Sequence, residues 1–192
     1  MLQLLIGLVV FLGIHSVAVV ALPLRDRMAA KSEMGWKALY AIASLIGIVL
    51  VVRGYAELRL TPTVLYVPPI GLRHVAAVLM LPAFAFFIAP YFPGRIKTAL
   101  KHPQLIAVKA WALAHLLVNG NLADVLLFGS FLIWAVVDRV SMKKRVARPL
   151  PGAPESKAND VIVVVVGLLL YVAFVMWGHE ALIGMKPFAG IN

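Results

Sequence analysis

The sequence predicts an all-α, polytopic membrane protein, a bundle of about six transmembrane helices with both termini non-cytoplasmic. Three observations lead to this prediction. Of the 192 residues, 62% are hydrophobic and only 14% are charged, whereas soluble domains are about half apolar and a quarter charged. Apolar segments recur at the length of about 17–25 residues that crosses a bilayer. The basic residues collect mainly in short segments between these apolar runs.

The apolar segments are expected to be helices, because an isolated strand leaves its backbone groups unpaired in lipid. The first segment lacks a basic stretch before it and a small-x-small cleavage pattern after it, so we expect a retained span and not a signal peptide. Pro82 is expected to kink the third. Residues 145–159, rich in proline and charge, form the one long linker, and residues 1–192 are expected to form a single membrane domain. The predicted spans are 2–22, 36–53, 71–92, 103–119, 121–138 and 160–183.

The net charge of +10 is unevenly distributed along the chain. By the positive-inside rule, the segments richest in Lys and Arg face the cytoplasm and anionic lipid headgroups. Nucleic acid is not an expected partner, because the basic cluster 143–145 has no interleaved aromatic residues. The expected cytoplasmic set is Arg25, Arg27, Lys31, Lys37, Arg95, Lys97, Lys101, Arg139, Lys143, Lys144, Arg145, Arg148 and Lys157, and the opposite set is Arg53, Arg59, Arg73 and Lys186.

The chain contains no cysteine. Disulfides, thiol nucleophiles, cysteine-ligated clusters and covalently attached haem are therefore excluded. Any metal or cofactor must be held by histidine, carboxylate or backbone groups.

His15 and His115 lie inside two different predicted spans. An ionisable residue at membrane depth is costly and is usually functional. Two neutral imidazoles on separate helices suit bis-histidine ligation of a b-type haem, whose macrocycle is readily buried in an apolar site. The alternative is that each histidine forms a hydrogen bond to a neighbouring helix.

Trp111, His115 and Asn119 recur at every fourth position and share one face of the fourth predicted span. Trp111 could pack on a cofactor, and Asn119 could fix a ring or a carboxyl group through hydrogen bonds. Alternatively, Trp111 is a packing residue or an interfacial anchor, and Asn119, next to Gly120, is a turn residue.

His102 precedes Pro103, a residue that suits the first turn of a helix. The positive end of that helix would attract an anionic ligand group, which His102 and Lys101 could help to hold. The alternative is that His102 simply marks the start of a helix at the membrane surface. His74 and His179 are expected at the interface. Asp124 is expected to favour the N-terminus of the fifth span by its charge.

Several of these motifs resemble the NnrU family. They are His15-Ser16, the charged loop with Arg25 and Asp26, and the block KHPQ…WALAH…NGN between Lys101 and Asn121. The resemblance is strongest over residues 8–138. The family includes bacterial proteins linked to denitrification and the plant and cyanobacterial 15-cis-zeta-carotene isomerase.

The resemblance implies a multi-pass protein of the bacterial inner membrane. In the isomerase branch, haem b is held between two histidines that match His15 and His115, whereas the position of His102 is not a ligand. For the bacterial branch it implies a link to nitric oxide metabolism.

Two departures separate this chain from the isomerase branch. That branch has a histidine at the end of the second span, where this chain has Arg53 or Tyr55, and its sequence after the fifth span differs. Of the family's properties, we therefore expect this chain to share haem ligation, together with a redox or nitric-oxide-linked role. The alternatives are a haem-dependent isomerase of a hydrophobic polyene and a cofactor-free assembly or regulatory protein.

A weaker resemblance concerns the His102-Pro103 turn. It is similar to the turn that opens a helix in membrane methyltransferases that use S-adenosylmethionine. Lys101 replaces their arginine, and the later cofactor segment of those enzymes is missing. A methyltransferase function is therefore a weaker hypothesis than haem binding.

Overall fold

The computed structural model describes residues 1–146, 148 and 150–187. The described residues form helices joined by turns, with no strand beyond an isolated bridge between Val64 and Asn121. The chain divides into two compact units. Unit 1 contains Met1–Arg73 and His115–Val146, and unit 2 contains His74–Ala114 and Ala147–Asn192. Each unit is described by itself.

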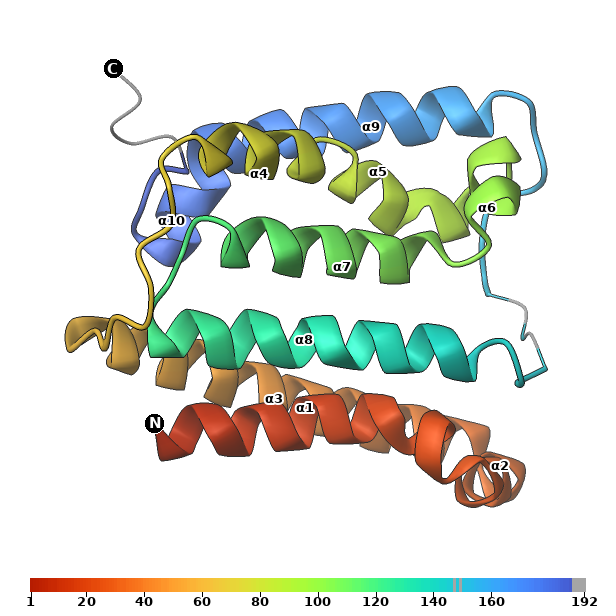
Figure 1. Cartoon of the computed structure of the whole chain (residues 1–192). Helices are drawn as coiled ribbons and strands as arrows, with labels where there is room; N and C mark the ends of the chain where they lie inside the picture. The colour runs from red at the N-terminus through yellow and green to blue at the C-terminus, as the bar shows by residue number, and fades with distance from the viewer. Residues whose placement is uncertain (147, 149, 188–192) are drawn as a thin grey trace. The chain divides into compact units, whose positions relative to one another are not determined.

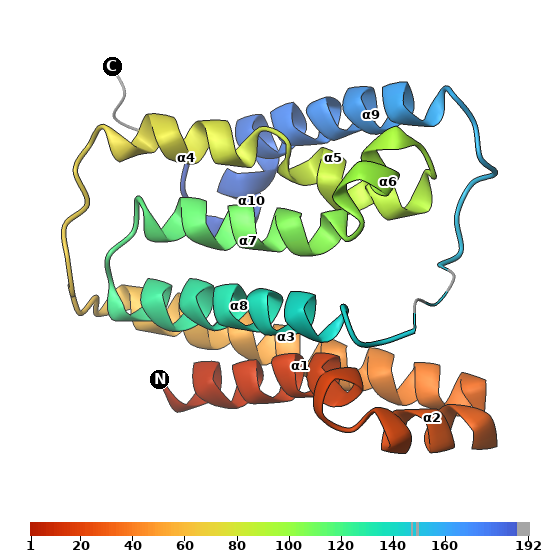
Figure 2. The same ribbon diagram turned by 45° about the vertical axis from the view of Figure 1, so that its right-hand side comes forward.

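Unit 1 is built on α1 (Leu2–Val20), α3 (Glu33–Leu60) and α8 (Leu122–Ser141), which lie side by side in both Figure 1 and Figure 2. Glycines let α1 and α3 approach closely. A Cβ added at Gly47 would lie 2.7 Å from the backbone nitrogen of Phe11, and one at Gly54 would overlap the backbone of Leu4. Small residues at a helix interface are the usual way in which apolar membrane helices gain packing contacts.

Two elements of unit 1 differ from the prediction. The charged segment after the first span forms a helix of its own, α2 (Leu22–Lys31), with proline in its first turn. The second predicted span, 36–53, lies inside the longer α3 of 28 residues. This helix starts early because the Ser32 side chain accepts a hydrogen bond from the Gly35 backbone N–H, and it ends just before Pro62.

Unit 2 contains the third and sixth predicted spans. The kink predicted at Pro82 is confirmed, since α4 (Leu72–Met80, which begins in unit 1) stops before it and α5 (Ala83–Ile88) starts after it. Its core includes Ala85, Ala89 and Val163. The remaining elements are η1 (Ala89–Tyr91), α6 (Arg95–Leu100), α7 (Pro103–Leu116, which ends in unit 1), α9 (Asn159–Ala173), η2 (Phe174–Gly178) and α10 (His179–Ile183).

The predicted linker 145–159 is tied to unit 2 near its end. The backbone N–H of Ala153 donates to the carbonyl of Tyr91 at 2.8 Å. The buried Asn159 amide donates to the carbonyls of Pro93 and Pro154 at 2.7 and 3.0 Å. This part of the linker is therefore packed against the chain that precedes α6.

The helices are apolar on their outer surfaces, as expected for a membrane protein. Among the described residues, four segments are long and apolar enough to cross a bilayer, and only 11–17% of each most apolar window is buried. The other two predicted spans correspond to α7, with 14 residues, and α8, with 20, or about 21 and 30 Å of helix. The six-span topology and the outward-facing termini stay predictions. The four segments are Leu2–Val20, Glu33–Leu60, Leu72–Tyr91 and Asn159–Ile183.

Candidate functional site

His15 lies on α1, and its ring is fixed by a local hydrogen bond. Nδ1 is 2.7 Å from the carbonyl oxygen of Phe11, one helical turn earlier. Because a carbonyl only accepts, Nδ1 must carry the proton, and Nε2 of the neutral ring then has the lone pair. Metal-binding histidines are commonly oriented by such a bond from the other ring nitrogen to a carbonyl. The structure therefore presents His15 in the tautomer that a metal requires.

Aromatic side chains surround the half-buried His15 ring. Phe11 stacks on it with ring centroids 4.2 Å apart, and the Tyr40 ring from α3 lies 4.9 Å away. Trp134 from α8 meets it edge-on at 5.9 Å. Phe11 in turn packs on Phe131 at 5.6 Å. This environment would suit the face of a flat aromatic molecule.

His115 is the second-last residue of α7, and its ring stacks on Phe128 of α8 at 4.5 Å. Its carbonyl oxygen accepts hydrogen bonds from the backbone N–H and the side-chain Nδ2 of Asn119, at 2.9 and 3.0 Å. Asn119 thus closes the end of α7, which confirms the interpretation as a turn residue. Its proposed bond to a cofactor stays a prediction.

Both predicted ligands belong to unit 1 and face α8. Phe128, beside His115, and Trp134, beside His15, are six residues apart on that helix, or about 9 Å along its axis. The donor type and the aromatic lining fit a bis-histidine haem site.

Among the described residues, no three His, Cys, Asp or Glu side chains gather in a way that would hold a bare metal ion. A pair of axial histidines does not need such a group, because the porphyrin supplies the other iron ligands.

A pair of charges lies one helical turn beyond Trp134. Asp138 forms an ion pair with Arg145, and their side chains are 13% and 15% exposed. Three side-chain atoms of the described residues are buried without a hydrogen-bond partner: Ser44 Oγ, Trp134 Nε1 and Arg145 Nε. All three belong to unit 1.

The opposite end of α8 is held by Asp124, which is 3% exposed. Its carboxylate accepts hydrogen bonds from the Tyr55 hydroxyl at 2.6 Å and from the Asn121 backbone N–H at 3.1 Å. The expectation that Asp124 favours this helix start is confirmed by its place in a capping box with Asn121. Its partnership with Tyr55 is a contact that the sequence did not suggest.

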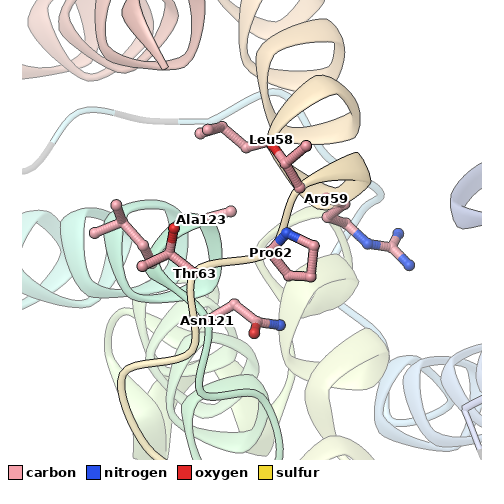
Figure 3. Close-up of a pocket in the computed structure, with 8 residues that line it drawn as sticks. Leu58, Arg59, Pro62, Thr63, Asn121 and Ala123 are labelled. Carbon is pink, nitrogen blue, oxygen red and sulfur yellow. The ribbon is translucent and has the colours of Figure 1, made fainter.

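A cavity of about 180 Å³ opens beside this end of α8 (Figure 3). Leu58 and Arg59 come from the end of α3, Pro62 and Thr63 from the segment that follows, and Asn121 from the start of α8. The Arg59 guanidinium points away from Thr63. The remaining lining residues are Thr61, Leu122 and Ala123.

Tyr66 closes the same end of unit 1. Its hydroxyl donates to the carbonyls of Leu116 and Asn119. Partial burial and then the charge of Asp124 raise the pKa of this phenol. Tyr66 thus remains a neutral donor at physiological pH and fastens the turn that follows His115.

The other predicted residues lie in unit 2. His102 immediately precedes α7, and its carbonyl accepts from the Ile106 N–H, which confirms the helix start there. Trp111 is half-buried one turn before His115 on the same helix. His74 is exposed, and His179 Nδ1 contacts the Met185 carbonyl at 2.6 Å. Roles of His102 and Trp111 toward a cofactor stay predictions.

Sequence reasoning missed Tyr40, Trp134 and the Asp138–Arg145 pair as neighbours of His15. A signal was present on α8, because Trp134 and Asp138 are one turn apart on the same face of an apolar helix. Their approach to α1 depends on tertiary packing that spacing alone does not encode.

The family model described as NnrU protein matches residues 3–187, nearly the whole chain. No curated protein and no solved structure matches it. With its apolar helices, the chain is a membrane protein that belongs to the NnrU family.

Proposed function

We propose that this membrane protein binds haem b in unit 1, with His15 and His115 as the axial ligands. One observation carries the proposal: the hydrogen bond from His15 Nδ1 to the Phe11 carbonyl leaves Nε2 as a lone-pair donor in an aromatic, half-buried setting. His115 supplies a second ring within the same unit.

The surrounding side chains would orient the macrocycle and exclude water from it. Phe11 and Phe128 each stack on one of the two histidines, and Phe131 joins them through its contact with Phe11. Such apolar walls around a few placed polar groups are typical of cofactor sites.

Bound haem would supply one-electron redox chemistry or coordination of a small molecule at iron. We therefore propose a redox or nitric-oxide-linked role at the bacterial inner membrane, as the family's link with denitrification implies. Isomerisation of a hydrophobic polyene is the alternative within the same site. In both cases α7 and α8 complete a six-span bundle whose basic segments face the cytoplasm.

A second candidate is a cofactor-free assembly or regulatory protein. It is favoured by the contacts that both histidine rings already make with phenylalanines of their own unit. In this case His15 and His115 would stabilise helix packing only.

The visible spectrum of the detergent-purified protein, expressed with ample haem, separates the two candidates. The haem proposal predicts a Soret band with the sharp visible bands of a low-spin, six-coordinate iron. The His15→Ala and His115→Ala variants should each lose the haem or convert it to a five-coordinate form. The His74→Ala variant is the matched control, because its ring is exposed in unit 2.

A colourless wild-type protein would reject the haem proposal. An unchanged low-spin spectrum in both ligand variants would reject the ligand assignment alone. If haem is present, nitric oxide binding to the reduced protein and chromatography of an added cis-polyene decide between the two chemical roles.

A further inference from the structure

Two side-chain N–H donors of unit 1 are buried without an acceptor among the described residues. Trp134 Nε1 and Arg145 Nε are both buried and without a hydrogen-bond partner. Ser44 Oγ shares this property, but a serine within a helix can rotate its hydroxyl toward the carbonyl one turn earlier. The N–H of a tryptophan or of an arginine Nε has no such freedom and only donates. Native proteins seldom leave groups of this kind unmatched, so each one calls for an explanation.

The two donors belong to one side of the His15 site. Trp134 meets the His15 ring edge-on, 5.9 Å between centroids. Asp138 is one turn further along the same face of α8, about 6 Å along the axis, and its carboxylate pairs with an Nη of Arg145. This pair holds the guanidinium next to α8 while Nε stays without an acceptor. The site therefore has a donor-rich edge on the side of the basic segment 139–148.

The missing acceptor is best matched by an anionic oxygen group. An arginine Nε–H and its neighbouring Nη–H form the fork that grips a carboxylate. The indole N–H of Trp134 adds a third donor that accepts nothing in return. Haem b has two propionate carboxylates at one edge of its macrocycle. One of these carboxylates would supply the acceptor that Arg145 Nε lacks.

We propose that Arg145 and Trp134 bind a propionate carboxylate of the haem that His15 ligates, with Asp138 as the residue that positions the guanidinium. This inference rests on the proposed haem function and adds an orientation, in which the propionate edge faces the basic segment 139–148. A lipid headgroup phosphate has related chemistry and is attracted to basic segments of this kind, so the experiment must separate the two sources.

The test compares iron protoporphyrin IX with its dimethyl ester, which keeps the iron and the ring but has no free carboxylate. Both are titrated into the haem-free full-length protein in detergent, and affinity is measured from the Soret change. The wild type should bind the acid at least about tenfold more tightly than the ester, or about 1.4 kcal/mol. In Arg145→Lys and Trp134→Phe this preference should shrink toward equality, because only the acid loses binding.

The chosen variants keep the fold intact. Arg145→Lys retains the charge that pairs with Asp138, and Trp134→Phe retains an aromatic ring next to His15. The matched control is Lys144→Met, which removes an exposed charge from the same basic segment and should keep the wild-type preference. The Soret and visible bands should stay those of a bis-histidine haem in all three variants, since the axial ligands are unchanged.

Each other outcome overturns a defined part of the proposal. Equal affinity of the wild type for acid and ester, or an unchanged preference in both variants, overturns the propionate assignment and leaves haem ligation standing.

A further experiment compares binding to vesicles of phosphatidylglycerol with binding to vesicles of phosphatidylcholine. If both variants lose a preference for the anionic vesicles while the preference for the haem acid is unchanged, the donors hold a lipid phosphate and the propionate assignment is wrong. A wild type that binds neither porphyrin overturns the proposed function itself.

Discussion

The two units differ in how completely their buried polar groups are paired. In unit 2, Asn159 donates to two carbonyls, and Asp160 accepts from the backbone N–H groups of Arg95 and Ile96, both at 3.0 Å. In unit 1, the donors of Trp134 and Arg145 are buried without an acceptor. Polar groups in unit 2 therefore fasten the chain to itself, whereas unit 1 combines a paired buried carboxylate, Asp124, with donors that have no acceptor.

The histidines follow the same division. His15 and His115 each stack on a phenylalanine within unit 1, whereas His74 in unit 2 is exposed. The comparison teaches that stacked aromatic contacts together with unmatched donors, more than histidine content, mark the candidate site, since His179 in unit 2 meets the Phe174 ring only edge-on. Apart from His102 and Trp111, unit 2 is therefore an internal control, in which a substitution should affect folding without affecting cofactor binding.

The largest expected effect comes from Asp138→Ala in unit 1. This change leaves the mostly buried Arg145 guanidinium without its ion-pair partner, and breaking such a pair from one side costs about 3 kcal/mol or more of unfolding free energy. Haem affinity should fall as well, because the guanidinium loses the residue that positions it. Thermal unfolding in detergent and haem titration provide the two measurements.

The control for that change is Asp26→Ala. Asp26 pairs with Arg25 at 3.2 Å, but its side chain is 48% exposed, so the loss should be less than about 1 kcal/mol. If the two aspartate variants unfold at the same temperature and bind haem equally, the Asp138–Arg145 pair neither stabilises unit 1 nor contributes to haem binding.

The next largest loss of stability is expected from Asn159→Ala, which tests unit 2. The side chain is 3% exposed and its amide joins the carbonyls of Pro93 and Pro154. Leaving these groups unmatched should lower the unfolding free energy by about 2 kcal/mol. The haem spectrum of the folded fraction should stay that of the wild type, because the ligands belong to unit 1.

Ser156→Ala is the matched control for Asn159→Ala, since it removes one exposed hydrogen bond from the same segment. It should change stability by a few tenths of a kcal/mol, as is usual for surface substitutions. A spectrum altered by Asn159→Ala but not by this control would contradict the separation of the two units.

Tyr55→Phe tests the closed end of α8. It removes the hydroxyl that donates to the buried Asp124 carboxylate at 2.6 Å, and a hydrogen bond to a charged group contributes about 1.5 kcal/mol or more. Thermal unfolding should show this loss, and Tyr171→Phe, a tyrosine of α9 in unit 2, serves as the control. Equal stability of the two variants would mean that Asp124 relies on its bond to the Asn121 backbone alone.

The helices and their ends were accessible from the sequence because they depend on local patterns. Apolar length located four segments able to cross a bilayer, and Pro82 marked the break between α4 and α5. His102 before Pro103 correctly marked the start of α7. Each of these features depends on residues near one another in the chain.

The contacts around the site were not accessible, because they join residues far apart in the sequence. Tyr55 and Asp124 are separated by 69 residues, and the approach of Trp134 to His15 depends on how α8 packs beside α1. The length of α3 was also underestimated. Its start is fixed by a serine cap, and its last turns contain Arg53, Glu57 and Arg59, which made the sequence pattern appear to end early.

Ser32→Ala gives the smallest expected effect and separates stability from binding within unit 1. The Ser32 hydroxyl accepts from the Gly35 N–H at 3.0 Å and caps α3, a contact worth about 1 kcal/mol. Unfolding should shift by this amount, measured against Ser156→Ala, while haem affinity stays at the wild-type value. Ser32 belongs to the same unit as the ligands but is exposed and contributes no donor to the site. A loss of haem in Ser32→Ala as large as in Asp138→Ala would therefore show that haem retention reports the stability of unit 1 as a whole, and the contrast drawn from unmatched donors would fail.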